Sequence, residues 1–206
     1  MKKKICIMIL ITSLALQSNA QKTNGSWNMQ PKVGLNVATM TNDDDAKVRV
    51  AFVGGLELEY NVASNFSFSF GALYSQQGCK GKSEGYDATI KMDYINVPLM
   101  INYYLSDGLA LKAGIQPGFL INDKVKVSAN GVSAEVGIEE SLHAAGIDAK
   151  LNSMDLSIPI GVSYKFNNIQ LDARYNWGMT KIIKGSGIEP SKNSVFEFTI
   201  GYVFGL

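Results

Sequence analysis

One histidine, His143, occurs in the chain of 206 residues, and Ser141, Glu139 and Glu140 lie beside it in the sequence. A serine, a histidine and an acid can perform nucleophilic catalysis only when the histidine is fixed beside the nucleophile and oriented by the acid. Here the group lies in the middle of the longest stretch without a strand pattern, where a solvated histidine is the more common case. We therefore expect no catalytic residues and no enzymatic activity.

Two other features have residue types that could form a site. Asp43, Asp44 and Asp45 offer the oxygen ligands that divalent cations prefer, but a charge run in a loop is usually only solvated. Cys79 is the only cysteine after the first 20 residues, so no disulfide can form within that part. A buried, inert thiol is favoured over a bond to a second chain, and we expect neither a metal nor a cofactor.

The strongest pattern in the sequence is an alternation in two runs, 48–60 and 66–78. Even-numbered positions in both runs are mainly apolar or aromatic, and odd-numbered positions are mainly small, polar or charged. Because side chains on a strand alternate between two faces, one face is apolar and the other polar. Nothing in the sequence offers a helical layer to cover the apolar face. A transmembrane β-barrel, apolar toward lipid and polar inward, fits this pattern.

The expected inward positions carry charges of both signs. The interior of an eight-stranded barrel is only just wide enough for its own side chains, and isolated charges there are costly. We expect these residues to pair, which gives a closed, salt-bridged interior and not a pore. The set comprises Arg49, Lys112, Lys165 and Arg174 against Glu57, Glu59, Asp172 and Glu197.

The N-terminus has the features of a secretory signal peptide. Three lysines at positions 2–4 precede an apolar run, 5–16, and a small-x-small site ends at Ala20. The run is too short to span a bilayer as a helix. We expect cleavage after Ala20, which leaves 21–206 as one barrel domain. The formal net charge of +1 gives no support to nucleic-acid binding.

Eight strands are expected, in which long and short connections alternate. This predicts an all-β, eight-stranded antiparallel up-and-down transmembrane barrel with short periplasmic turns and long extracellular loops. The strands are 32–40, 48–60, 66–78, 91–104, 109–122, 154–166, 169–179 and 195–206, and the long loops are 41–47, 79–89, 123–152 and 182–193.

Local signals refine this scheme. Segments 124–127 and 132–136 flank Asn130 and Gly131, which predicts a small hairpin above the barrel. Segment 139–145 is expected to form one or two helical turns. Pro98, Pro117 and Pro159 lie inside expected strands and predict bulges or local breaks, because proline cannot donate to the ladder.

Three stretches resemble the PorT-like outer-membrane β-barrel family of Bacteroidetes: Leu-Tyr-Ser-Gln-Gln-Gly at 73–78, Tyr-Ile-Asn-Val-Pro-Leu at 94–99 and Ala-Arg-Tyr-Asn-Trp-Gly at 173–178. The resemblance covers about residue 31 to the C-terminus. It implies a small eight-stranded barrel, similar to the OmpX and OmpA barrels, in the outer membrane. The namesake of the family is an accessory factor of type IX secretion.

The C-terminal strand carries a second resemblance. Thr199, Gly201, Phe204 and Leu206 are spaced as in the signal by which the barrel-assembly machinery recognises its clients. This implies that the chain is inserted into the outer membrane of a Gram-negative cell by that machinery.

Taken together, we expect a monomeric, non-enzymatic outer-membrane barrel with a structural or surface-interaction role through its extracellular loops. An accessory role in type IX secretion is the alternative, and a lipid-modifying enzyme is the least favoured. The expected partners are outer-membrane lipid and lipopolysaccharide, the assembly machinery, and other envelope or secretion components. Lysines near the outer rim are expected to meet lipid phosphates: Lys80, Lys82, Lys124, Lys126, Lys181 and Lys184.

Overall fold

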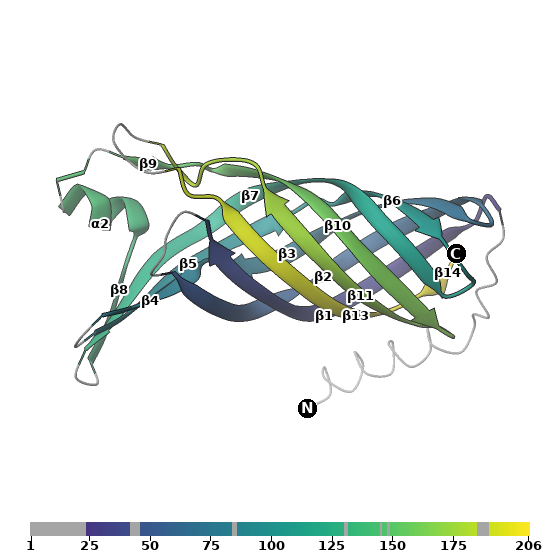
Figure 1. The fold of residues 1–206 in the computed structure, drawn as a ribbon, viewed down its shortest axis with the longest axis horizontal. Helices are drawn as coiled ribbons and strands as arrows, with labels where there is room; N and C mark the ends of the chain where they lie inside the picture. Colours follow the sequence, from purple (N-terminus) through teal and green to yellow (C-terminus); the bar gives the residue numbers. More distant parts are fainter. Residues whose placement is uncertain are drawn as a thin grey trace, which may run out of the picture.

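The structure is a computed structural model that describes residues 24–41, 46–83, 86–129, 132–144, 146–147, 149–184 and 190–206. The expected signal peptide, 1–20, and the acidic run at Asp43, Asp44 and Asp45 lie outside the described residues. Antiparallel strands form most of the described chain (Figure 1). No described helix is long and apolar enough to cross a membrane.

The described elements follow one another along the chain in this order: β1 (Trp27–Met40), β2 (Lys47–Ala63), β3 (Phe66–Gln77), β4 (Cys79–Ser83), β5 (Tyr86–Asn96), β6 (Leu99–Tyr104), β7 (Leu109–Ala129), β8 (Val132–Val136), α2 (Ile138–Ala144), β9 (Lys150–Leu151), β10 (Met154–Phe166), β11 (Ile169–Gly178), β12 (Ile183–Lys184), β13 (Asn193–Tyr202) and β14 (Phe204–Gly205).

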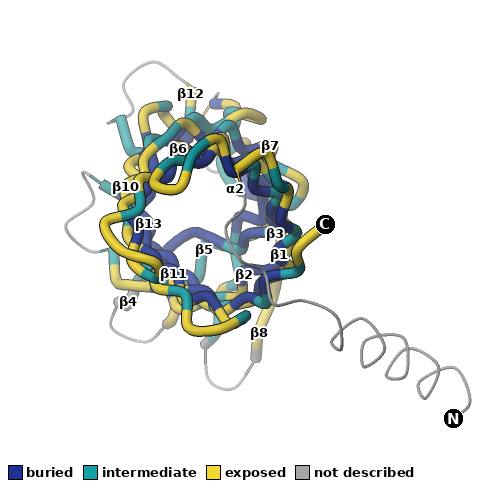
Figure 2. The backbone as a smooth tube through the Cα atoms, turned by 90° about the vertical axis from the view of Figure 1, so that its right-hand side faces the viewer, coloured by how far each residue is buried: buried dark blue, intermediate teal, exposed yellow. Residues whose placement is uncertain are grey.

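The main sheet closes into a barrel. β1 pairs with β2 on one side and with β13 on the other, and β10 joins β7 to β11. Viewed toward one end, the backbone forms a ring along which buried and exposed positions alternate (Figure 2). Closure removes the free edges that make open sheets prone to aggregate. The expectation of an all-β barrel is confirmed.

The sheet contains twelve segments and not the eight strands predicted, because β8 adds a hairpin strand and regular pairing is interrupted at three places. Gly78 has φ +113° and separates β3 from β4, and a Cβ atom there would lie 2.2 Å from the carbonyl oxygen of Ile90. Residues 97–98 separate β5 from β6, where Pro98 cannot donate to the ladder. Val203 separates β13 from β14 and donates its N–H to the carbonyl of Asn168 at 2.7 Å.

The other two prolines also lie where pairing is interrupted, as predicted. Pro117 lies in β7 opposite the 97–98 break and accepts a hydrogen bond from the N–H of Val97 at 2.8 Å. Pro159 lies in β10, whose pairing with β7 skips from Ser157 to Ile160. Pro117 and Pro159 therefore interrupt pairing on one side without ending their strands, whereas Pro98 lies in a break between two strands.

The two faces of the wall differ as the alternation predicted. Val33 and Leu35 are each 53% exposed on the outside, whereas Asn36 is fully buried inside. The outer face continues with exposed aromatic and aliphatic side chains on β2, β3, β7, β10, β11 and β13, among them Phe52, Phe70 and Ile115. β1 begins five residues earlier than expected, so Trp27 lies in a strand and stacks on Tyr60 with ring centroids 4.8 Å apart.

The predicted long loops are more ordered than expected. Most of 79–89 forms β4 and the start of β5, which pair with each other, and β12 in 182–193 pairs with β9. Within 123–152, β7 continues to Ala129 and forms a hairpin with β8, and α2 follows, as the local signals predicted. These elements gather beyond one end of the barrel (Figure 1). The strand alternation simply continues past the apolar band: Ala88, Ile90 and Met92 alternate with polar residues.

Candidate functional site

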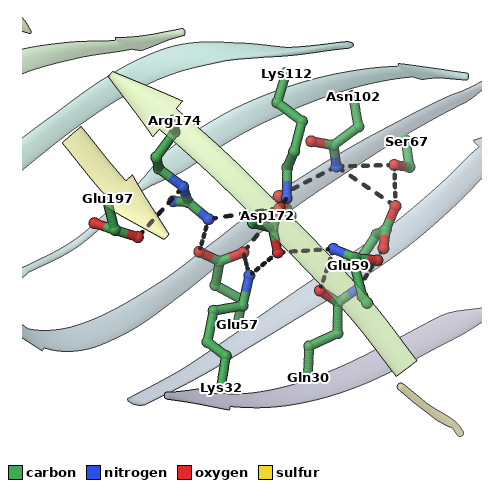
Figure 3. Close-up of polar contacts among 12 residues, drawn as sticks. Gln30, Lys32, Glu57, Glu59, Ser67, Asn102, Lys112, Asp172, Arg174 and Glu197 are labelled. Atoms are coloured by element: carbon green, nitrogen blue, oxygen red, sulfur yellow. Dashed lines mark hydrogen bonds and ion pairs between the residues drawn. The ribbon is translucent and has the colours of Figure 1, made fainter. Parts of the chain in front are cut away.

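A layer of paired charges crosses the barrel interior (Figure 3). Glu57 on β2 contacts Lys32 on β1 at 2.7 Å and Arg174 on β11 at 2.8 Å. Asp172 on β11 contacts Lys112 on β7 at 2.9 Å and Lys32 at 3.0 Å. The side chains of these five residues are at most 3% exposed. They form what we call the ion layer, and each cation in it has a carboxylate partner.

Glu197 extends the ion layer, and Lys32 is its unpredicted member. Glu197 on β13 lies 3.4 Å from Nε of Arg174 and accepts a hydrogen bond from Asn176 at 3.2 Å. The predicted strand begins at Lys32, whereas β1 begins at Trp27, so Lys32 lies inside the strand and is buried like Asn36. Its even number, shared with inward-facing Asn36, was the available signal.

Three of the eight predicted residues lie outside the ion layer: Lys165, Arg49 and Glu59. Lys165 is half-buried beside the turn at 167–168, and the ion pairs within the described chain do not include it. A lysine that close to the barrel end can reach solvent, so it needs no carboxylate partner. Arg49 is buried but donates to the carbonyl oxygen of Gln77, and it lies on the loop-end side of the ion layer.

Glycines make room for the ion layer. Gly55 lies opposite Lys32, Gly71 opposite Glu57, and Gly161 between Lys112 and Arg174. A Cβ atom at Gly71 would lie 2.7 Å from Cγ of Glu57, and one at Gly161 would lie 2.7 Å from Cβ of Arg174. The long charged side chains therefore fit across a narrow lumen because the residues opposite them on neighbouring strands are glycines, which have no side chain.

Glu59 has a different environment on the short-turn side of the ion layer. It is 2% exposed and accepts hydrogen bonds from Gln30 at 2.5 Å and from the hydroxyls of Ser67 and Tyr104 (Figure 3). Within the described chain, its hydrogen-bond donors are all uncharged. Gln170 joins this group to the ion layer, because its Nε2 donates to both Gln30 and Asp172 at 3.1 Å.

The loop end of the lumen is apolar, which the sequence analysis did not predict. A buried cluster, which we call the outer cap, packs there and consists of Met40, Cys79, Met92, Tyr94, Ile138 and Ile182, with Leu142, Leu151 and Ile183 packed against it. The carboxylate of Asp123 accepts the N–H of Ile138 at 3.0 Å, and Glu139 accepts that of Leu151 at 2.9 Å, which fixes α2 over the cluster. The interior thus has an ionic layer and an apolar cap in series.

Comparison with known proteins identifies the family of this closed barrel. Residues 19–184 match the family described as the outer membrane protein beta-barrel domain. The chain belongs to this family. Membership indicates an outer-membrane location for this barrel protein.

One solved structure supports the same fold, and two others are similar to this chain. Ail, the attachment invasion locus protein of Yersinia pestis, has a TM-score of 0.51 at 16% identity, covering 88% of this chain and all of that one. OprG from Pseudomonas aeruginosa gives 0.48 at 14% identity over 89% and 97% of the two chains. Neisserial surface protein A gives 0.48 at 14% identity over 85% and 96%. No curated protein matches the sequence.

The residues considered for catalysis do not form a site in this barrel protein. His143 lies exposed on α2, and the hydroxyl of Ser141 donates to the carbonyl oxygen of Gly137 at 2.9 Å. Glu139 is used by the backbone of Leu151. The serine and the acid are thus engaged with main-chain groups and not with the histidine. Cys79 is buried and belongs to the outer cap.

The four residues of the expected assembly signal lie at the end of the last strands. Thr199 is buried inside, and Gly201 lies opposite Lys32. Phe204 stacks on Tyr202 with ring centroids 4.5 Å apart, and Leu206 is exposed at the chain end. The terminal residues therefore lie on the wall at the short-turn end (Figure 1).

Proposed function

We propose that this family member is a non-enzymatic, monomeric surface protein, in which an eight-stranded barrel is a closed anchor and the loop end binds partners outside the cell. The observation that carries the proposal is the folded layer beyond the barrel. β8, β9, β12 and α2 are not needed to span a membrane, yet they are ordered: β8 pairs with β7, Ile138 of α2 is part of the outer cap, and Leu151 of β9 and Ile183 of β12 pack against it. Short periplasmic turns and long outer loops are the usual arrangement of such barrels.

The count of eight crossings rests on how the interrupted segments continue. β4 follows β3 after one glycine, β6 follows β5 after 97–98, and β14 follows β13 after Val203. Each pair runs in one direction along the wall: β3 and β4 both pair with β2, and β13 and β14 both pair with β1. We count each pair as one crossing, which leaves eight around the ring.

A transport role has less support. The ion layer places opposite charges in contact across the lumen, and the outer cap fills the loop end with apolar side chains. A conducting lumen is instead polar and water-filled. Partner binding is supported by apolar side chains exposed at the loop end, where Val127 is 40% and Val136 37% exposed.

An accessory role in type IX secretion is the second candidate, supported by the resemblance of the three strand motifs to the PorT-like proteins of Bacteroidetes. Secretion profiling of a deletion strain tests it directly. Accumulation of cargo in the periplasm would favour this role, and unchanged secretion would leave surface binding as the better account.

The proposed function is tested on intact cells. An epitope inserted at 130–131, between β7 and β8, should bind antibody without permeabilisation, and one inserted at 167–168, between β10 and β11, should not. N-terminal sequencing of the purified protein should find residue 21 first. Replacing 123–152 with a glycine-serine linker should abolish capture of surface partners and leave the barrel folded. Labelling of the 167–168 site alone would refute the orientation.

A further inference from the structure

We propose that one outward face at the loop end binds the phosphate groups of outer-leaflet lipid headgroups. The face belongs to the antiparallel sheet formed by β4, β5, β7 and the hairpin strand β8. We call it the lysine face and define it as Lys80, Thr89, Lys91, Lys124, Lys126 and Glu135. The inference rests on the proposed function, because it requires the loop end to lie outside the cell.

The register brings these residues together in two rows. Lys80 lies opposite Thr89, Thr89 opposite Lys126, and Lys126 opposite Glu135, so one row crosses four strands. In the next row, Lys91 lies directly opposite Lys124. Opposite residues on one face have Cβ atoms roughly 5 Å apart, and like charges at that distance destabilise a sheet. An anion between them removes this cost.

The direction of the lysine face follows from what its other side covers. Ile90 and Val125 alternate with the lysines along β5 and β7, and both pack against the outer cap with Ile138 and Leu142 of α2. Side chains that alternate with these residues must point away from the cap. The lysine face is therefore directed outward, to the same side as the lipid-facing wall.

Protein carboxylates neutralise only part of this charge. Glu135 contacts Nζ of Lys91 at 2.5 Å, and its pKa is lowered first by that hydrogen bond and then by the charges of Lys91, Lys124 and Lys126. One carboxylate is thus shared by three lysines. Asp87 lies further along β5, opposite Ser128, at the distal edge of the face. The residues of the face carry four positive charges against one negative charge.

The position of the lysine face along the barrel axis matches the expected position of the lipid phosphate groups. On β7 the last lipid-facing apolar residues are Phe119 and Ile121, which are 47% and 55% exposed. Lys124 follows three residues later on the same strand, a rise of about 10 Å. Lipid phosphates lie just beyond the hydrocarbon region. The face thus combines charge, direction and depth that suit an anionic headgroup better than a soluble protein.

The test uses the full mature chain in nanodiscs of phosphatidylcholine, with and without lipid A. Thermal unfolding is followed as lipid A is added, since a ligand of the folded state raises the midpoint. The variant Lys91→Gln/Lys124→Gln/Lys126→Gln should lose most of the rise. Each lysine near a charged membrane surface contributes about fivefold in affinity. The charge-preserving variant with arginine at the same three positions should keep the rise.

A matched control removes the same charge from the other side of the loop end. Lys150→Gln/Lys181→Gln/Lys184→Gln alters exposed lysines on and beside the β9–β12 ribbon, where Lys150 and Lys184 also lie opposite each other. Lys181 and Lys184 are among the lysines that the sequence analysis expects to meet lipid phosphates, but they lie outside the lysine face, so this variant should respond to lipid A as the parent protein does. Equal losses in both triple variants would overturn the proposal, because the effect would then be general charge. An unchanged rise in the first variant would overturn it as well.

Two further ligands distinguish lipid phosphate from free phosphate. Lipid A without phosphates should produce no rise, and inorganic phosphate in phosphatidylcholine nanodiscs should reproduce little of it. A full rise with inorganic phosphate would refute the lipid assignment. The binding assay is independent of cell orientation, whereas the epitope test is not. Failure of the epitope test alone would reject the proposed function and remove the lysine face from the outer leaflet.

Discussion

Removing the carboxylate of Glu57 should be among the most damaging single changes to the barrel interior. The side chain is fully buried and holds Lys32 at 2.7 Å and Arg174 at 2.8 Å, with Lys112 at 3.7 Å. In Glu57→Ala, Asp172 would be left to balance Lys32 and Lys112, and Arg174 would keep Glu197. Three cations would then share two carboxylates in the buried interior.

The expected cost is about 3–5 kcal/mol, the usual penalty for removing one partner of a buried ion pair. Urea unfolding in detergent micelles measures it, followed by tryptophan fluorescence at Trp27 and Trp177 and by the mobility shift of folded barrels on gels. Glu57→Gln keeps the size and some hydrogen bonds, so its loss should be smaller. The double variant with Arg174→Met should be less destabilised than the two single losses combined, because it removes both charges.

The control is Glu135→Ala on β8, which also removes a glutamate from an ion pair. Glu135 is exposed and contacts Lys91, so its loss should change the barrel's unfolding midpoint little. If Glu57→Ala unfolds at the same urea concentration as the parent protein, the ion layer does not stabilise the barrel. Such a result would refute the reasoning that paired charges hold the interior closed.

Three other results are expected. Gly34→Ala should lower the folded yield and destabilise the barrel by about 1–3 kcal/mol, because its Cβ would lie 1.9 Å from the carbonyl oxygen of Phe198; unchanged gel mobility and yield would contradict this. Ile138→Asp should speed proteolysis within 123–152 and leave the barrel's urea midpoint unchanged, since Ile138 packs only in the outer cap. The carboxyl of Glu135 should titrate below an ordinary glutamate in NMR, because Lys91 lowers its pKa; the pair's contribution is therefore present above the ordinary pKa and is lost as the pH falls through the lowered one.

The wall of the barrel was predictable because the alternation of residue types along each strand shows which side chains face lipid and which face the lumen. The alternation within one strand is enough to place Leu35 outside and Asn36 inside, without knowledge of the neighbouring strands. The same rule predicted that Glu57, Lys112 and Arg174 would share the lumen. It also holds at 86–89, where the alternation continues in β5 although these residues belong to the predicted loop 79–89.

The partners inside the lumen were not predictable, because they depend on how strands are staggered around the ring. Glu57 meets Arg174 across 117 residues, and no local pattern fixes which strands oppose each other across a closed barrel. The neutral surroundings of Glu59 and the apolar cap over the loop end are consequences of the same stagger. The outer cap was also not predicted because Met92 and Tyr94 lie in a strand whose inward positions were expected to be polar.

The ion layer and the outer cap differ in how far apart in the sequence their contacting residues lie. This difference affects the order in which they form as the barrel closes. The ion layer joins Lys32 on β1 to Asp172 on β11 across 140 residues, so it can form only when the ring closes. Half of the outer cap, Met92, Tyr94 and Ile138, comes from β5 and α2, which are close in the sequence. Contacts between distant residues carry the larger loop-closure cost and form late. The ion layer therefore forms late and stabilises the closed barrel. Glu57→Ala should delay closure of the barrel, while the outer cap still forms.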